Sequence, residues 1–494
     1  MLALVLLLTC VPAYGPRQVG AEEVLRELRD LGARKEWTML AERGAEARES
    51  LEHGSDAWIE ASAWWASALY WDWDPERLTA LGRDVADAVR VREGAEYREG
   101  FDPLGSVARN PRTAGALLDV YVLWAYALQS RGEHESAVVV LTPIPCFVAQ
   151  RRDVRASYFA RTACIDLARS LSALGRAEEA ERALTAIRDQ RGGTNEAALA
   201  TALLEPRVPD GSAYRGVLAR DPEFGETKRA LLAALPAARL RLAQALGREV
   251  ESLPEVHVGV ADRSPEHAGE LAFTFGDPRR PFAPIVVVFA DPAQLALRDL
   301  VEVLAHELAH AVAIVEIGRS YERLPMWVRE GMANAFAGEL DGILVRGLSL
   351  RFSADPSAFL GQEAAAMLFP RFVAAEAGLA LRLLVEYEGI EGVAKMHALF
   401  AGGASLSEAL ERLTGDGVDS YLTAATVYVQ GETMDLRAES LADLQAFEET
   451  RRAGPKALLE TVRAVLARDS APPLARHVAE FLLASAPPAA EAGE

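Results

Sequence analysis

Residues 306–310 read His-Glu-Leu-Ala-His and lie in an apolar stretch, Leu295 to Val315, that contains neither glycine nor proline. Apolar residues recur there at helical spacing, which predicts one buried helix. The preceding Asp291-Pro292 supplies a capping side chain and a first-turn proline, so a start near residue 292 also fits. His306 and His310 are one turn apart and are expected to project from the same face.

Two imidazoles on one helical face can bind a single metal ion. Glu307 follows the first histidine, offset around the helix, where such a glutamate takes a proton from a metal-bound water. The alternative is a purely structural pair of buried histidines. Two of the chain's eight histidines form this pair in a core helix. Because unpaired polar groups are costly in a core, the pattern favours the metal site.

A catalytic metal usually has three protein ligands, so a third donor is needed. Residues 324–333 read Leu-Pro-Met-Trp-Val-Arg-Glu-Gly-Met-Ala and predict a second amphipathic helix with Pro325 near its first turn. Glu330 would face the first helix from there. Gly331 removes a side chain where two helices would need to approach closely around the metal.

Glu316 is the rival third ligand, because it occupies the place of the third histidine in the longer motif HExxHxxGxxH. Enzymes with that motif break the helix at the glycine. In this chain residues 311–315 read Ala-Val-Ala-Ile-Val and continue it. On a continuous helix Glu316 would be rotated away from the two histidines.

These two segments resemble the peptidase MA-like metallopeptidases, a branch of the gluzincins in which an HExxH helix precedes a helix carrying L-P-x-W-x-x-E-G-x-A. The resemblance extends to residues 380–389 and 402–415 and covers roughly residues 254–425. It implies a small α+β zinc-peptidase domain that acts on a peptide or protein substrate. One Zn²⁺ would be bound by His306, His310 and Glu330, with Glu307 as the catalytic base.

The resemblance does not fully assign two further roles: the residue that orients a histidine ligand and the donor that stabilises the oxyanion. Asn334, one turn after Glu330, is a candidate to orient a histidine ligand; the alternative is a polar residue on the exposed side of its helix. Related gluzincins often use a tyrosine beyond the third ligand to stabilise the oxyanion, and Ala375 to Gly378 offers none. Tyr387 is the nearest tyrosine and is expected to pack at a helix end. The oxyanion donor is therefore unidentified.

Three segments ahead of the helix predict β-strands: 255–260, 271–275 and 285–289. In gluzincins a small sheet of this kind lies above the site, and its edge can hold an extended peptide through main-chain hydrogen bonds. His257 alternates with valines in the first strand, which places it on the solvent face without a functional role.

Residues 22–250 predict an α-helical domain. Gly132 and Gly175 stand at matching positions in two segments with the same internal spacing, which indicates a repeated helix-turn-helix unit. Residues 174–180 resemble the centre of a tetratricopeptide repeat, although the 43-residue offset between the two glycines exceeds that family's period. An ordinary helical bundle is the alternative. Stacked helix pairs would offer a surface to a protein partner.

Five tryptophans fall between Trp58 and Trp73. Such a cluster could stack on a sugar or peptide. Trp58 and Trp65, like Trp64 and Trp71, are seven residues apart, which places each pair on one helical stripe and favours packing between helices.

Residues 430–486 predict further helices, with breaks at 453–455 and 471–473, and 487–494 a disordered tail. The predicted fold is thus mainly α, with a helical-repeat-like N-terminal domain ahead of the zinc-peptidase domain.

Residues 1–15 resemble a signal peptide without its positive charges, which predicts export to the periplasm or the exterior. Lipoprotein anchoring through Cys10 is less favoured, because Thr9 stands where a smaller residue is preferred. Without the leader, Cys146 and Cys164 are the only cysteines, and either a disulfide or two buried thiols fit.

The formal charge of −20 argues against nucleic acid or an anionic membrane as partner. Beyond the leader no apolar run reaches the roughly 18 residues of a membrane span. Two functions remain in competition. One is a zinc-dependent peptidase, and the other is a helical-repeat scaffold or binding protein with an inactive metallopeptidase-like domain.

Overall fold

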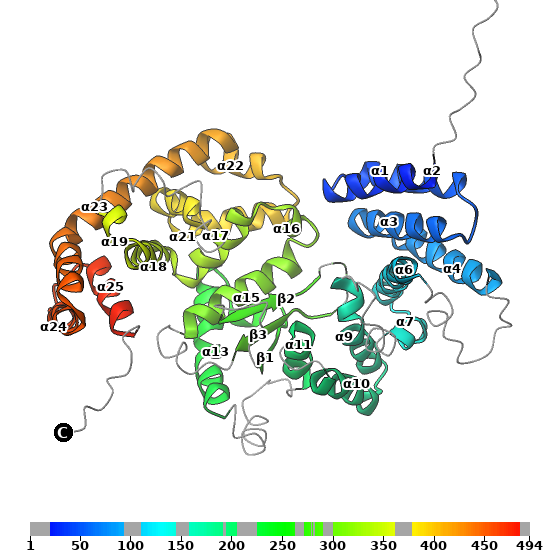
Figure 1. Ribbon diagram of the computed structural model, residues 1–494, viewed down its shortest axis with the longest axis horizontal. Helices are drawn as coiled ribbons and strands as arrows, with labels where there is room; N and C mark the ends of the chain where they lie inside the picture. Colours follow the sequence, from blue (N-terminus) through cyan, green and yellow to red (C-terminus); the bar gives the residue numbers. More distant parts are fainter. Residues whose placement is uncertain are drawn as a thin grey trace, which may run out of the picture. The chain divides into compact units, whose positions relative to one another are not determined.

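The computed structural model shows a mainly helical protein (Figure 1). It describes residues 20–92, 110–144, 158–190, 194–204, 225–261, 271–277, 279, 282–289, 300–360 and 378–484. The chain divides into two compact units. Unit 1 comprises Met1–Gly192 with Arg279–Pro281, and unit 2 comprises Gly193–Pro278 with Phe282–Glu494.

Unit 1 contains four helical hairpins among its described residues. They are α1 (Ala21–Ala33) with α2 (Trp37–Ser50), α3 (Asp56–Asp72) with α4 (Pro75–Arg92), α6 (Pro111–Ser130) with α7 (His134–Leu141), and α9 (Tyr158–Ala173) with α10 (Ala177–Gln190).

The four hairpins turn in the same way. Each first helix is followed within two residues by a residue with positive φ: Lys35 (59°), Trp73 (56°), Gly132 (75°) and Gly175 (73°). At each turn this residue donates its N–H three residues back, and the next residue donates five back, as in Gly132 to Gln129 and Glu133 to Leu128. This is the Schellman arrangement, which satisfies the last carbonyls of a helix. The units predicted at Gly132 and Gly175 are therefore hairpins, and two more precede them.

The clustered tryptophans of unit 1 pack between helices. A β-carbon at Gly32 of α1 would lie 2.4 Å from the ring of Trp64, and one at Gly44 of α2 would lie 2.9 Å from Trp65. Trp58 is only 2% exposed. The glycines thus make room for the indoles, and the structure supports packing rather than ligand stacking for these residues.

Unit 2 begins with α11 (Asn195–Leu204), α13 (Gly225–Ala245) and η1 (Val250–Ser252), followed by the strands β1 (His257–Ala261), β2 (Ala272–Phe275) and β3 (Ile285–Phe289). Next come α15 (Leu300–Glu316), α16 (Ser320–Arg323), α17 (Met326–Ala337), α18 (Leu340–Ala354), α19 (Pro356–Phe359), η5 (Gly378–Leu381) and α21 (Arg382–Ala401). The last helices are α22 (Leu406–Thr414), α23 (Val418–Ala453), α24 (Pro455–Leu466) and α25 (Pro473–Ala484). The boundary expected near residue 250 falls inside this unit, since the division lies between Gly192 and Gly193.

The three predicted strands form one sheet in the order β1-β3-β2. β1 runs parallel to β3 with His257 opposite Ile285, and β2 runs antiparallel to β3 with Ala272 opposite Val288. Every residue of β3 is buried, which fits its central position and its run of β-branched residues. β2 is therefore an edge strand of the described sheet, and α15 lies against it (Figure 1).

His257 does not lie on a solvent face, so that expectation is wrong. It is 7% exposed, and its Nε2 lies 2.6 Å from the main-chain oxygen of Ala202 in α11. Helix α11 covers β1 closely, because a β-carbon at Gly259 would lie 2.6 Å from the Cα of Ala202. A buried histidine with a main-chain partner is a structural residue.

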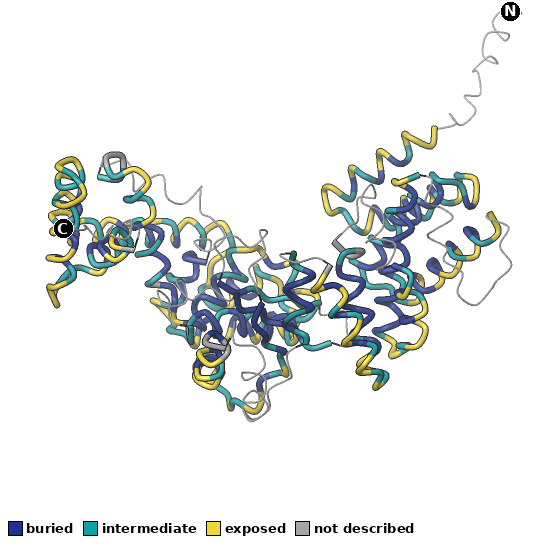
Figure 2. Tube along the Cα trace, turned by 60° about the horizontal axis from the view of Figure 1, so that its bottom comes forward, coloured by how far each residue is buried: buried dark blue, intermediate teal, exposed yellow. Residues whose placement is uncertain are grey.

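Buried residues run through the interior of each unit, dark blue in Figure 2. In unit 2 one core joins the sheet to α13, α15, α17 and α21, and a second core joins α18 to α23, α24 and α25. The 36-residue α23 contributes Tyr421 to the first core and Phe447 to the second. It spans the interval 425–430 left between two predicted domains. The predicted breaks before α24 and α25 are confirmed.

Several expectations fall outside the described residues: the leader 1–15, Cys10, Cys146, the helix start at 292–299 and the tail 487–494. Cys164 is buried. Among the described helices, none combines the length and the apolar character needed to cross a membrane.

Replacing Gly259 by alanine should destabilise unit 2 by about 1–3 kcal/mol, because the added carbon overlaps the α11 main chain. Gly431→Ala is the matched control. Gly431 lies within α23 with nothing within 4 Å of its added carbon, so alanine should instead stabilise by up to about 1 kcal/mol. Chemical denaturation would measure both changes, and an equal effect of the two variants would contradict the packing of α11 on β1.

Candidate metal centre

Helix α15 brings the two motif histidines together. It continues beyond His310 as far as Glu316, as the sequence predicted. Leu304, Leu308 and Val312 are buried in the core of unit 2, which fixes the rotation of the helix about its axis. His306 and His310 lie on another side of it, with their Nε2 atoms 3.1 Å apart.

Glu330 reaches the same point from α17. One carboxylate oxygen lies 3.5 Å from His306 Nε2 and the other 3.7 Å from His310 Nε2. One donor atom from each of these three residues lies within 4.8 Å of the other two, and all three side chains are partly buried. Two imidazoles and a carboxylate in this arrangement could bind one metal ion. The predicted ligand set is therefore brought together.

Glu316 lies elsewhere, as the continuous helix requires. Its carboxylate is 2.7 Å from Nη1 of Arg248 and 3.7 Å from Nε2 of His397. This pairing with groups from the end of α13 and from α21 accounts for the charge of Glu316, which is thus not a ligand in this structure.

Gly331 marks a close approach, but its neighbour differs from the one expected. A β-carbon at Gly331 would lie 2.8 Å from the side chain of Leu381 and 3.0 Å from the main-chain oxygen of Gly378. The tight contact is thus with η5 rather than with α15. Small residues on both sides let η5 support the helix that carries Glu330.

Electrostatics favour an anionic oxygen donor at this point. Burial alone would raise the pKa of Glu330, but its interactions with His306 and His310 outweigh that effect and hold the pKa well below the usual range. Burial would lower the pKa of His306, whereas Glu330, with the charges of Glu307 and Glu339, raises it. Glu330 is therefore a carboxylate and attracts a positive charge, whether proton or metal.

Each histidine of the cluster also has an outer nitrogen, Nδ1, which is not the one that faces Glu330. The two Nδ1 atoms lie beside different groups. Nδ1 of His310 lies 2.5 Å from the hydroxyl of Tyr321, and burial raises the pKa of that phenol, which therefore stays neutral. Nδ1 of His306 lies 3.7 Å from a carboxylate oxygen of Glu339. Both contacts leave the Nε2 atoms directed at Glu330. Neither Tyr321 nor Glu339 was predicted from the sequence.

Asn334 is 1% exposed, so the alternative of an exposed polar residue is wrong. Its amide packs toward η5, because a β-carbon at Gly378 would lie 2.7 Å from Nδ2 of Asn334. Glu339 lies beside the outer nitrogen of His306, and Tyr321 beside that of His310.

Glu307 is buried and contacts the edge strand β2. The hydroxyl of Thr274 in β2 lies 2.6 Å from Oε2 of Glu307 and 2.9 Å from its main-chain oxygen. Its single proton can be donated to either oxygen. Glu307 is thus hydrogen-bonded to the strand that borders the site. The alternating pattern of that strand did not predict this contact.

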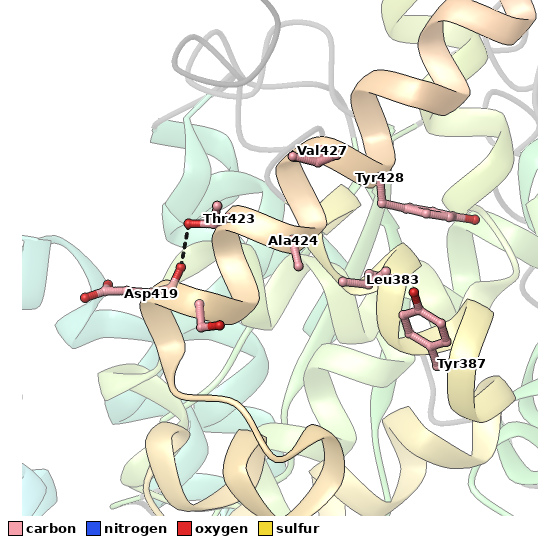
Figure 3. Close-up of a pocket in the computed structure, with 8 residues that line it drawn as sticks. Leu383, Tyr387, Asp419, Thr423, Ala424, Val427 and Tyr428 are labelled. Atoms are coloured by element: carbon pink, nitrogen blue, oxygen red, sulfur yellow. Dashed lines mark hydrogen bonds between the residues drawn. The ribbon is translucent and has the colours of Figure 1, made fainter.

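No oxyanion donor is evident at Tyr321 or Tyr387, the tyrosines that flank Glu330 in the sequence. Tyr321 is engaged with the outer nitrogen of His310. Tyr387 is 76% exposed and lines an open groove between α21 and α23, together with Leu383, Asp419 and Val427 (Figure 3). This groove includes none of the three clustered residues.

Comparison of the sequence with protein families and with curated proteins found no match to either. The assignment of a function therefore depends on the geometry of this centre.

Glu330→Ala should remove or severely weaken binding of one divalent metal ion per chain, because it deletes a ligand and the charge that attracts the cation. Glu316→Ala should leave the stoichiometry unchanged, since that carboxylate pairs with Arg248. Elemental analysis after dialysis against Zn²⁺ would measure both. Loss of metal from the Glu316 variant alone would reverse the ligand assignment.

Proposed function

We propose that the protein is a zinc-dependent peptidase. The observation that carries this proposal is the convergence of His306, His310 and Glu330 on one point, with Glu307 next to the first ligand on the same helix. Three protein donors leave a fourth position of a tetrahedral ion for water or substrate. Imidazole nitrogens and a carboxylate suit Zn²⁺, although they do not exclude other transition metals.

When bound, zinc would supply a Lewis acid that polarises the substrate carbonyl and makes water more acidic. Glu307 would act as general base, accepting the proton of the attacking water and then donating it to the leaving amine. Thr274 would hold one oxygen of Glu307 and so orient the other toward the reaction. His306, His310 and Glu330 would hold the metal.

The edge strand β2 supports a peptide as substrate. Among the described residues it pairs with β3 alone, so no second strand of the described sheet lies on its other side. An extended peptide could add to this edge by backbone hydrogen bonds. Since Thr274 of the same strand contacts Glu307, a peptide bound there would lie close to the general base.

Glu307→Gln should lower peptide cleavage by roughly 100 to 10,000-fold, the usual contribution of a general base, while zinc binding is retained. Glutamine keeps the shape of the side chain but cannot accept the proton. Turnover of a mixed peptide library, followed by mass spectrometry alongside zinc content, would measure both effects.

The competing function is a binding protein in which the helical hairpins of unit 1 hold a partner and the metal domain is inactive. Stoichiometric zinc without cleavage of any library peptide by the unmodified protein would favour it. Cleavage unaffected by Glu307→Gln would equally contradict the role of Glu307 as general base.

Thr274→Val should lower kcat roughly tenfold, corresponding to about 1.4 kcal/mol for a hydrogen bond to a charged group. Thr274→Ser keeps the hydroxyl and should restore most of the activity. Thr433→Val is a control, since Thr433 also donates to a main-chain oxygen but lies in α23. Equal activity of the valine and serine variants would show that Thr274 does not position the base.

A further inference from the structure

The outer nitrogen of His306 is buried without a hydrogen-bond partner. Its Nε2 faces Glu330 and His310, so this is the nitrogen that would bind a metal. A neutral imidazole that binds metal through Nε2 carries its proton on Nδ1. That proton then needs an acceptor, because a buried donor without one is costly.

Glu339 is the acceptor within reach. Its oxygen lies 3.7 Å from Nδ1, and its side chain is only 3% exposed. The backbone places it there: α17 ends at Ala337, Gly338 follows with φ of 76°, and Glu339 comes next, directly ahead of α18. The N–H of Glu339 donates to the main-chain oxygen of Asn334, which fixes this turn against the helix that carries Glu330.

Arg346 accompanies the buried carboxylate. Its Nη2 lies 3.9 Å from Glu339, two turns away along α18. Gly342 between them leaves the space, since a β-carbon there would lie 2.9 Å from Nη1 of Arg346. An arginine near a buried carboxylate offsets part of the cost of burying it, and a carboxylate is a strong hydrogen-bond acceptor.

We propose that Glu339 is the positioning residue of His306: its carboxylate accepts the Nδ1 proton and fixes Nε2 toward the metal. The inference rests on the proposed metal site but not on peptidase activity. His310 differs, because its outer partner is the neutral phenol of Tyr321. A carboxylate makes its histidine a more basic ligand than a phenol does, so the two histidines contribute unequally.

The test is the zinc affinity of the full-length Glu339→Gln variant, measured by competition with a chromophoric chelator. We expect the dissociation constant to rise by roughly 10 to 100-fold, the usual effect of losing such a partner. The absorption bands of the Co²⁺-substituted protein should also shift, because the ligand field at His306 changes. Arg346→Gln should weaken affinity in the same direction by a smaller factor.

Glu316→Gln is a closely matched control. Glu316 is also a carboxylate 3.7 Å from a histidine, but that histidine is His397, which is not in the cluster. Its zinc affinity and cobalt bands should match those of the unmodified protein. Thermal unfolding of the metal-free variants would verify that all of them fold.

An unchanged zinc affinity and cobalt spectrum in Glu339→Gln would overturn the proposal. Equal losses in the Glu339 and Glu316 variants would also overturn it, because the effect would then be general destabilisation. Failure of the unmodified protein to bind zinc would contradict both this inference and the proposed function. Zinc binding that depends on Glu339, without peptide cleavage, would support the inference and contradict only the peptidase.

Discussion

The centre depends on one constraint: two imidazoles a single turn apart must direct their Nε2 atoms at the same point. The buried leucines and valines of α15 supply that constraint, because they fix the rotation of the helix against the sheet and α13. The 3.1 Å between the two Nε2 atoms follows from this rotation. So does the position of Glu316, which the same continuous helix turns toward Arg248.

Helix α17 adds the third candidate ligand and is itself packed against η5. Glu330 can reach the histidines because α17 packs on η5 at the Gly331 and Gly378 contact, where neither side has a side chain. The turn after α17 then returns Glu339 to the outer side of His306. One short segment, from Pro325 to Glu339, therefore provides both an inner ligand and an outer neighbour of the centre.

The sequence predicted those parts of the site that local periodicity determines. His306, His310 and Glu330 sit on two helices whose patterns are clear, and the three strands are bounded by glycine and proline. Tyr321, Thr274 and Glu339 were missed because tertiary packing alone brings them to their partners. The hairpins at Lys35 and Trp73 were missed because no glycine marks their turns. His257 was misplaced because the pattern of one strand does not reveal that α11 covers it.

Binding a metal and hydrolysing a peptide place different demands on this fold. The three ligands come from α15 and α17 alone. Hydrolysis also requires the general base to be correctly positioned relative to the substrate. Thr274 joins these two demands, because it belongs to the edge strand and contacts Glu307. A shift of β2 would therefore change the position of the Glu307 carboxylate and of a peptide bound at that strand together. An active enzyme and an inactive metal-binding protein would therefore differ at the sheet more than at the metal cluster.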